Sequence, residues 1–260
     1  MREVVVWALF DSGNGCYTKA ITRLNGEDGL CLKVYPIGID VEKKHNHFIN
    51  LDLADYKRLF GDNTLFDTLD KLPRPDVIVA SPPCESWSVA SAMKDGNACW
   101  KQEDLSDNLF SPQKEPSRFT VREFAEYEGY QYYYDRQFLK RINGELCVFN
   151  TVEIIKRYQP KIYLIENPAY GRIWEYIEKV MGFPLPFKNV VRYSNYDYML
   201  QKPTIFGGNI FLNLNALSDV RNTVSFNSIC SYNDRSNIPE KLLLTIFRKI
   251  VKELNKKEMV

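Results

Sequence analysis

The sequence has few of the features that mark a metal site, a disulfide framework or a membrane protein. It has only two histidines, and because no third candidate ligand is spaced with His45 and His47 we expect exposed residues and no bound metal. None of its six cysteines forms a CxxC pair, so zinc-site and disulfide patterns are missing. The apolar run at residues 4–10 is too short to span a membrane and has no signal-like cleavage region. We therefore expect a cytoplasmic protein with no membrane partner.

A strong net charge and biased segments are also missing. The 34 Lys and Arg residues against 33 Asp and Glu residues give a formal charge of +1, so no overall attraction to a nucleic acid is evident, although a local basic face remains open. We find no internal repeat and no low-complexity linker. A chain of 260 residues with 45% hydrophobic and 26% charged residues is typical of one large globular domain, with or without an insertion. The function must therefore be inferred from local motifs.

Apolar segments alternate with helix-compatible segments along most of the chain. Four apolar segments predict buried strands, and they are 4–10, 33–40, 76–80 and 162–165. Helical patterns are found at 18–24, 152–158 and 239–254. This alternation predicts an α/β fold, with a mostly parallel sheet, helices on both faces and a ligand at the carboxyl ends of the strands.

The third predicted strand leads directly into Ser81-Pro82-Pro83-Cys84. Two consecutive prolines fix φ and remove backbone donors, so they stiffen the loop that carries the thiol. A thiol at a strand end lies where enzymes built on such sheets perform their chemistry. Cys84 is therefore a candidate nucleophile, and the alternative is a buried, inert cysteine beside a turn.

A carboxyl group follows the fourth predicted strand. Glu166, followed by Asn167 and Pro168, is expected on the same sheet edge as Cys84, where partial desolvation can tune a carboxyl toward acid–base chemistry. The alternative is a cap of the following helix. A nucleophile and a carboxyl at the ends of two strands meet a geometric requirement for a shared pocket.

The first predicted strand ends in a Gly-rich turn, Phe10-Asp-Ser-Gly-Asn-Gly-Cys16. Such a turn can cradle a phosphate or, since it lacks a lysine, admit an uncharged nucleoside cofactor. Asp40, at the end of the second strand, stands where an acid typically binds ribose hydroxyls, and a helix N-cap is the alternative. Asp52 is a further candidate for the adenine edge.

The order of Gly-rich turn, strand-end acid, Pro-Pro-Cys and Glu-Asn resembles that of the cytosine-5 DNA methyltransferase family, over roughly residues 4–92 and 145–209. The resemblance implies the Rossmann-like fold of S-adenosylmethionine-dependent methyltransferases, with S-adenosylmethionine as cofactor. It also implies that Cys84 attacks C6 of a flipped-out cytosine, that Glu166 contacts the N3 edge, and that C5 then takes the methyl group.

The resemblance also implies binding roles for individual residues. The cofactor would contact Phe10, Ser12, Gly13, Gly15, Asp40, Asp52 and Pro82. The DNA substrate would contact Ser81, Asn167, Tyr196, Lys202 and Thr204. The last three lie in the segment 192–204. This segment resembles the form found in short members of the family, which are often associated with phages or mobile elements. The alternative is an ordinary surface hairpin.

Residues 93–141 interrupt the α/β pattern with many aromatic residues, so we expect an insertion between two parts of a catalytic domain, 1–92 and 142–260. Fewer than thirty residues separate Phe206 from Arg235, too few for a separate target-recognition domain. The insertion is thus a candidate target-facing element, and a small tyrosine-rich core is the alternative. The basic residues after Arg235 are either a phosphate-facing patch or a solvated helix face.

These expectations describe a DNA cytosine-5 methyltransferase, with a cognate restriction enzyme or a recognition subunit as candidate partners. Two other functions stay open. One is cytosine-5 methylation of RNA, and the other is a non-catalytic cofactor- or DNA-binding subunit that needs a partner chain.

Overall fold

The computed structural model describes residues 3–11, 15–39, 47–88, 134–217, 223–224, 228 and 235–257, together with the backbone of 100–101 and 111–112. Within α4, side chains are described from residue 139 onward. The predicted insertion therefore lies mostly outside the described residues, as do Ser12, Gly13, Asp40 and His45.

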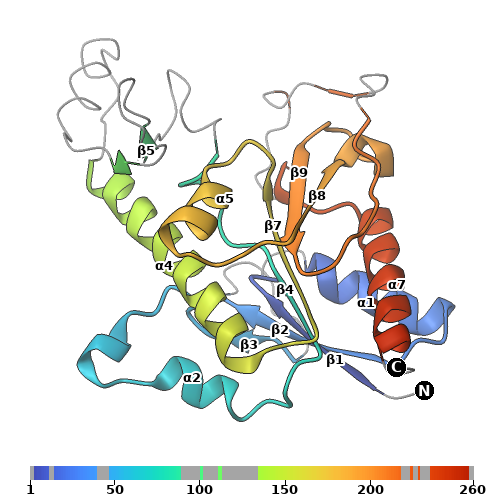
Figure 1. The fold of residues 1–260 in the computed structure, drawn as a ribbon, viewed down its shortest axis with the longest axis horizontal. Helices are drawn as coiled ribbons and strands as arrows, with labels where there is room; N and C mark the ends of the chain where they lie inside the picture. Colours follow the sequence, from blue (N-terminus) through green and yellow to red (C-terminus); the bar gives the residue numbers. More distant parts are fainter. Residues whose placement is uncertain are drawn as a thin grey trace.

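The core of the fold is a seven-stranded sheet with the order β3-β2-β1-β4-β7-β9-β8 (Figure 1). Its strands are β1 (Val4–Leu9), β2 (Leu32–Gly38), β3 (Ile49–Asn50), β4 (Val77–Ala80), β7 (Ile162–Pro168), β8 (Phe187–Arg192) and β9 (Pro203–Gly208). β9 is antiparallel to both of its neighbours, and the other pairs are parallel. The first five strands follow the Rossmann order, in which the direction of winding reverses between β1 and β4. The predicted α/β fold with a mostly parallel sheet is confirmed.

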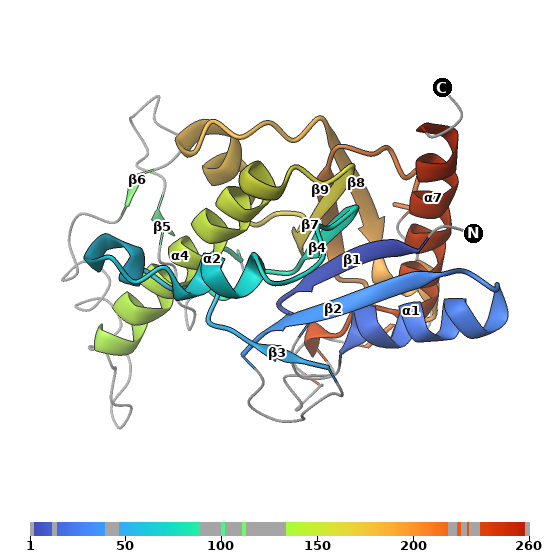
Figure 2. The same cartoon turned by 90° about the horizontal axis from the view of Figure 1, so that it is seen from below.

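Helices cover both faces of this sheet. The α-helices are α1 (Cys16–Glu27), α2 (Thr64–Leu69), α4 (Tyr134–Tyr158), α5 (Ile173–Glu175) and α7 (Glu240–Lys257). Shorter elements are the 3-10 helices η1 (Lys57–Phe60) and η4 (Tyr193–Tyr196), the π-helix η3 (Tyr176–Val180), and the two-stranded pair β5 (Trp100–Lys101) and β6 (Ser111–Pro112). α1 and α7 lie on one face, and α2 and α4 lie on the other (Figure 2).

The side chains of the strands alternate between the two helical layers, as the period of two requires. In β4, Val77 and Val79 pack with the α1 and α7 layer, whereas Ile78 and Ala80 pack with the α2 and α4 layer. All four are buried, which explains why this strand is a continuous apolar run. The same alternation decides which face each polar residue of the neighbouring strand β7 occupies.

The strand that carries Glu166 is longer than its apolar run indicates. We expected it to end at residue 165, but β7 continues to Pro168 because β9 pairs with it through Glu166↔Phe206 and Pro168↔Thr204. The long-range partner thus extends the strand beyond what its local sequence favours. Glu166 is consequently held within the ladder, and its backbone is fixed on both sides.

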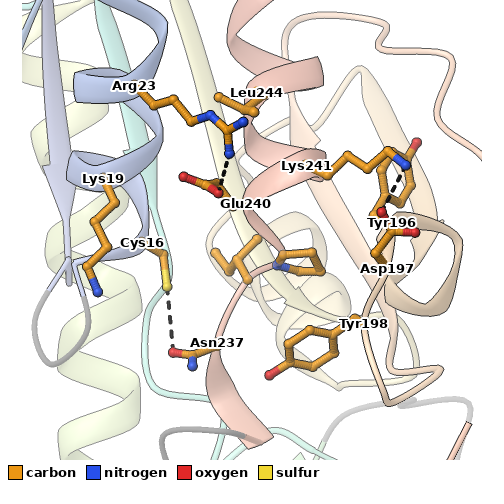
Figure 3. Close-up of a pocket in the computed structure, with 12 residues that line it drawn as sticks. Cys16, Lys19, Arg23, Tyr196, Asp197, Tyr198, Asn237, Glu240, Lys241 and Leu244 are labelled. Atoms are coloured by element: carbon orange, nitrogen blue, oxygen red, sulfur yellow. Dashed lines mark hydrogen bonds and ion pairs between the residues drawn. The ribbon is translucent and has the colours of Figure 1, made fainter. Parts of the chain in front are cut away.

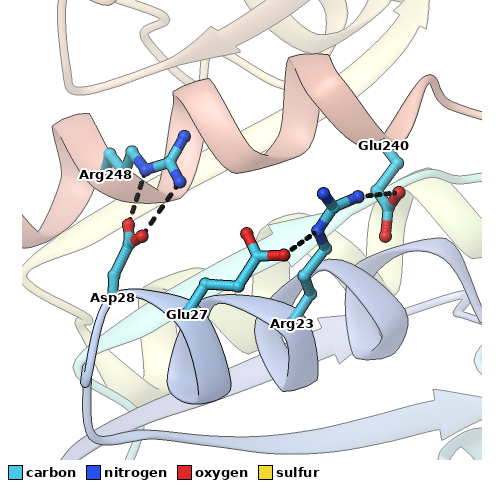
Figure 4. A network of polar contacts seen from close by, with 5 residues as sticks. All are labelled: Arg23, Glu27, Asp28, Glu240 and Arg248. Carbon is cyan, nitrogen blue, oxygen red and sulfur yellow. Dashed lines mark hydrogen bonds and ion pairs between the residues drawn. The ribbon is translucent and has the colours of Figure 1, made fainter.

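The amphipathic helix α7 packs beside α1, as Figure 4 shows. Two ion pairs cross between them: Arg23 to Glu240 at 2.8 Å, and Arg248 to Asp28 at 2.6 Å. These pairs are about half exposed, so the buried apolar faces hold the helices together and the ion pairs add little. Because Arg248 is bound to a carboxylate, as Lys241 is to Asp197, the carboxyl-terminal helix offers less free positive charge than its sequence indicates.

Candidate active site

Four strands end at one edge of the sheet. Leu9 of β1 pairs with both Ile37 of β2 and Ala80 of β4, and Ala80 in turn pairs with Ile165 of β7. The next residue along each strand is therefore aligned at the same edge, and these residues are Phe10, Gly38, Ser81 and Glu166. The expectation that the Pro-Pro-Cys and Glu-Asn segments share a sheet edge is confirmed.

Glu166 lies in a buried polar site on the α1 and α7 face of the sheet. Its side chain is 6% exposed, and its Oε1 accepts a hydrogen bond from the hydroxyl of Tyr193 at 2.8 Å. The following helix α5 begins only at Ile173, with Arg172 at its N-cap position, so the alternative of a helix-capping glutamate is wrong. A buried carboxyl with one hydrogen-bond donor is suited to proton transfer.

A second buried tyrosine lies beside Glu166. The hydroxyls of Tyr17 and Ser81 are 2.7 Å apart, and Ser81 continues the strand pairing next to Glu166. Burial, followed by the charge of Glu166, raises the pKa of Tyr17 well above its ordinary value, so this phenol is neutral at physiological pH. Sequence reasoning missed Tyr17 and Tyr193. Tyr17 could have been identified, because it begins the apolar face of the helix that follows the Gly-rich turn.

Cys84 is half-buried at the start of a tight turn. Its carbonyl oxygen accepts hydrogen bonds from the backbone N–H groups of Trp87 at 3.0 Å and Ser88 at 2.9 Å. Burial raises the pKa of the Cys84 thiol, while the positive charge of Lys202 acts in the opposite direction. The thiol is therefore partly accessible, and the residue that favours its ionised form comes from a distant segment of the chain.

Buried hydrogen bonds fix the loop that carries Cys84. The side-chain amide of Asn167 donates to the carbonyl of Pro82 at 2.8 Å, and the hydroxyl of Ser86 donates to the carbonyl of Lys140 at 2.6 Å. Lys140 also forms an ion pair with Glu85 at 3.2 Å. Asn167 is fully buried, so the structure gives this predicted substrate contact a role in holding the loop that carries Cys84.

The contact between this loop and α4 leads to a prediction about stability. A Cβ at Gly144 of α4 would lie 2.4 Å from Oγ and 2.7 Å from Cβ of Ser86, so Gly144→Ala must displace the loop. We expect it to lower the free energy of unfolding by about 1–3 kcal/mol, as overpacking does. Gly26→Ala is the matched control in α1, where a Cβ meets nothing within 4 Å, and we expect it to add about 0.5 kcal/mol. Urea unfolding compares the two, and equal effects would contradict the loop contact.

The three predicted substrate residues of the 192–204 segment, Tyr196, Lys202 and Thr204, have separate environments. The ammonium of Lys202 donates to the carbonyl of Ser236 at 3.2 Å and lies 5.0 Å above the ring of Tyr193. Thr204 is buried and donates its hydroxyl to the carbonyl of Lys202 at 3.0 Å. Tyr196 accepts a hydrogen bond from the backbone of Asn215 and lines a pocket. The 192–204 segment therefore belongs to the main sheet and its edge, which favours a role in the site over an ordinary surface hairpin.

An open pocket of about 790 Å³ lies between α1, η4 and the start of α7 (Figure 3). It is lined by Cys16, Lys19, Arg23, Tyr196, Asp197, Tyr198, Asn237, Ile238, Pro239, Glu240, Lys241 and Leu244. At its base the Cys16 thiol donates to Oδ1 of Asn237 at 3.6 Å. Burial raises the pKa of Cys16, as it does that of Cys84, and the positive charge of Lys202 acts in the opposite direction on both thiols.

The described residues on either side of the turn after β1 are Phe10, Asp11 and Gly15. Asp11 accepts hydrogen bonds from the backbone N–H groups of Tyr17 and Thr18, both at 3.0 Å, and therefore caps α1 from inside the turn. Gly15 begins this helix at φ 59°, which favours glycine, and Phe10 adopts φ 64°. A non-glycine residue at positive φ stores backbone strain, which is typical of functional turns.

The ends of β2 and β3 carry side chains whose chemistry fits an adenosine group. Ile39 is 49% exposed, and Asp52 is an exposed carboxylate whose Oδ1 accepts the backbone N–H of Ala54 at 2.9 Å. An exposed apolar side chain suits the ring face of adenine, and a carboxylate can accept a hydrogen bond from its exocyclic amine. Gly38 passes close to Phe10, with 3.4 Å from its ideal Cβ to Phe10 Cα, so a larger residue at position 38 would press on the turn. The residues present therefore fit a nucleoside cofactor.

The described residues contain neither a metal-ligand cluster nor a helix that could span a membrane. In the part of the chain that the structure describes, no group of three or more His, Cys, Asp or Glu side chains could hold a metal ion. Among the described helices, none combines the length and apolarity that crossing a membrane requires. His47, at φ 68°, is exposed, as expected.

Comparison with protein-family models and with curated proteins gives no match for this sequence. One similar solved structure is a crystal structure of an E. coli protein provisionally described as a DNA modification methyltransferase encoded within a prophage. The two chains are 12% identical with a TM-score of 0.39, and the match covers 79% of this chain and 46% of the other. This chain thus spans about half the length of that structure.

Proposed function

We propose that this protein transfers a methyl group from S-adenosylmethionine to C5 of cytosine in DNA. The observation that carries the proposal is the placement of Ser81, Cys84 and Glu166 at one edge of the sheet, where β4 ends and the adjacent parallel strand β7 runs on beside it. The Pro-Pro-Cys and Glu-Asn motifs, whose order resembles that of the cytosine-5 methyltransferases, thus meet at one edge. The protein would be a DNA (cytosine-5-)-methyltransferase.

Cys84 and Glu166 have complementary roles in this reaction. C5 of cytosine is a poor nucleophile until a thiolate adds to C6, and a proton shared with N3 accommodates the charge that this addition pushes onto the ring. Cys84 would form the bond to C6, and Glu166 would donate to N3. After C5 takes the methyl group, loss of the C5 proton to water, return of the N3 proton to Glu166 and expulsion of the Cys84 thiolate restore the aromatic ring and the free enzyme.

The burial of the site requires the target base to leave the helix. Glu166 is 6% exposed and Cys84 is half-buried, so neither can reach C6 or N3 of a cytosine that is stacked in a duplex. Enzymes that react with a base inside a duplex extrude it into a pocket. Base flipping is therefore part of the proposal, and Lys202 and Tyr196, beside the site, are proposed to contact the DNA.

The cofactor would lie along the ends of β1, β2 and β3. Bound there, S-adenosylmethionine supplies an electrophilic methyl group. Phe10 and Gly15 would contact it through the backbone, Asp52 would accept from the adenine amine, and Pro82 would close the side toward Cys84. Ser12, Gly13 and Asp40 are proposed to complete this site and lie outside the described residues.

A mechanism-based trap tests the nucleophile, the base and the substrate together. The protein is incubated with S-adenosylmethionine and duplex DNA that contains 5-fluorocytosine, in which fluorine at C5 blocks the final elimination. We expect a denaturant-resistant adduct whose cross-linked peptide contains Cys84. The exposed thiol of Cys31 gives the matched control, since Cys31→Ala should keep the adduct and Cys84→Ala should abolish it.

Parallel reactions with single-stranded DNA and RNA of the same sequence decide the substrate, because the 2′-hydroxyl distinguishes the two polymers. An adduct on RNA alone would replace DNA methylation with RNA methylation. Binding of cofactor and DNA with no adduct on any polymer would contradict the proposed activity. In that case a partner subunit would be required.

A further inference from the structure

A buried tyrosine outside the predicted site contacts two of its members. Tyr193 is fully buried, its hydroxyl donates to Oε1 of Glu166 at 2.8 Å, and the ammonium of Lys202 lies 5.0 Å above its ring. Tyr198 packs edge-on against the same ring at 5.8 Å. The phenol is therefore held from several directions while its hydroxyl points at the catalytic carboxyl.

The hairpin of β8 and β9 places this tyrosine. Arg192 pairs with Pro203, so Tyr193 and Lys202 are the next facing positions beyond the two strand ends. The backbone N–H of Tyr193 donates to the carbonyl of Gln201 at 2.8 Å, which closes the intervening segment. Lys202 adopts φ 28°, a strained value for a non-glycine residue, and such strain persists only where the surroundings hold the backbone firmly.

The hydroxyl of Tyr193 is a permanent donor. Burial and the neighbouring charge of Glu166 raise the pKa of Tyr193 well above its ordinary value, so the phenol keeps its proton throughout the physiological range. In the described part of the chain this hydroxyl is the hydrogen-bond partner of Oε1, and no bond joins Oε2 to another described side chain. The hydrogen bond to Oε1 thus fixes the plane of the Glu166 carboxyl, and Oε2 is left to contact a base.

We propose that Tyr193 is a positioning residue that orients Glu166 for contact with N3 of the target cytosine. This inference rests on the proposed function and adds a residue that the motifs do not contain. The hydroxyl holds one carboxyl oxygen, the sheet holds the backbone of Glu166 on both sides, and the remaining freedom of the side chain is rotation about its terminal bonds. Removing the hydroxyl releases that rotation.

The first test is Tyr193→Phe, which removes the hydroxyl and keeps the ring beneath Lys202. We expect the rate of methyl transfer in a single turnover to fall about 100-fold, as misplacement of a catalytic group by about 1 Å does, with the KM for DNA unchanged within twofold. Tyr163→Phe is the matched control, because Tyr163 is on the same strand as Glu166 but donates to the carbonyl of Pro184 at 3.0 Å. We expect the wild-type rate for this variant.

A double-mutant cycle separates positioning from a general structural effect. If Tyr193 acts through Glu166, then Tyr193→Phe lowers the residual rate of a Glu166→Ala protein by less than twofold. A further loss of about 100-fold in that background would overturn the proposal, as would a large rise in KM with an unchanged maximal rate.

The wild-type protein, Tyr193→Phe, Glu166→Ala and the double variant are also compared by urea unfolding, a measurement that does not depend on activity. We expect the unfolding midpoints to be non-additive, because each single variant breaks the same hydrogen bond. Additive midpoints in an active wild-type protein would overturn the positioning role alone. A wild-type protein that forms no adduct and transfers no methyl group would instead overturn the proposed function, and with it this role.

Discussion

Replacing Cys84 with serine is expected to lower the rate of methyl transfer to DNA by about 1,000-fold or more, because the nucleophile of a covalent mechanism is lost. A serine hydroxyl is far less ionised at neutral pH than a thiol, so it adds to C6 much more slowly. The variant should still bind cofactor and DNA, since the neighbouring contacts of the loop are made by Pro82 and Ser86. Single-turnover methylation together with equilibrium binding measures both properties.

The pH dependence of the wild-type protein checks the same assignment. Burial raises the pKa of the Cys84 thiol, so the thiol is mainly protonated at pH 7 and the thiolate fraction increases as the pH rises toward that pKa. We expect the wild-type rate to increase by about tenfold for each pH unit between 7 and 9, since the thiolate is the attacking species. The serine variant should lack this increase. A serine protein with a rate within tenfold of wild type would show that Cys84 is not the nucleophile.

Replacing Glu166 with glutamine is expected to lower the rate of methyl transfer by about 100- to 10,000-fold, the range found when a general acid or base is lost. Glutamine keeps an oxygen that can accept the hydrogen bond from Tyr193, so the buried site should stay folded. The amide cannot donate a proton to N3 and regain it in each turnover. The measurement is the single-turnover rate at saturating DNA, with the thermal midpoint as a check on folding.

A neutral surface substitution controls for the loss of negative charge. Glu253 lies on α7, where its ion pair with Lys256 at 3.5 Å is largely exposed, and Glu253→Gln should leave the rate unchanged. Glu166→Gln with wild-type activity would assign the glutamate a structural role. Loss of activity with an unfolded protein would point to the buried hydrogen bond with Tyr193 as a condition for stability.

Local sequence was enough to place Cys84 and Glu166, the pair proposed to be catalytic. Apolar runs predict β4 and β7, the two prolines before Cys84 stop the strand, and the carboxyl ends of neighbouring parallel strands meet at one edge in any sheet of this kind. These are properties of short segments and of a general topology. The α/β class, the shared edge and the amphipathic carboxyl-terminal helix could therefore be predicted before the structure was known.

Tertiary structure alone decided which residues surround that pair. Tyr193 lies 27 positions from Glu166 and reaches it only because β9 turns back between β7 and β8. Cys16 and Asn237 are 221 positions apart and share a pocket because α7 packs beside α1. Asn167 has the residue type of a substrate contact, but the alternation of β7 turns it into the interior, where it holds Pro82. Such contacts depend on the packing of distant segments, which leaves no periodic or local signal in the sequence.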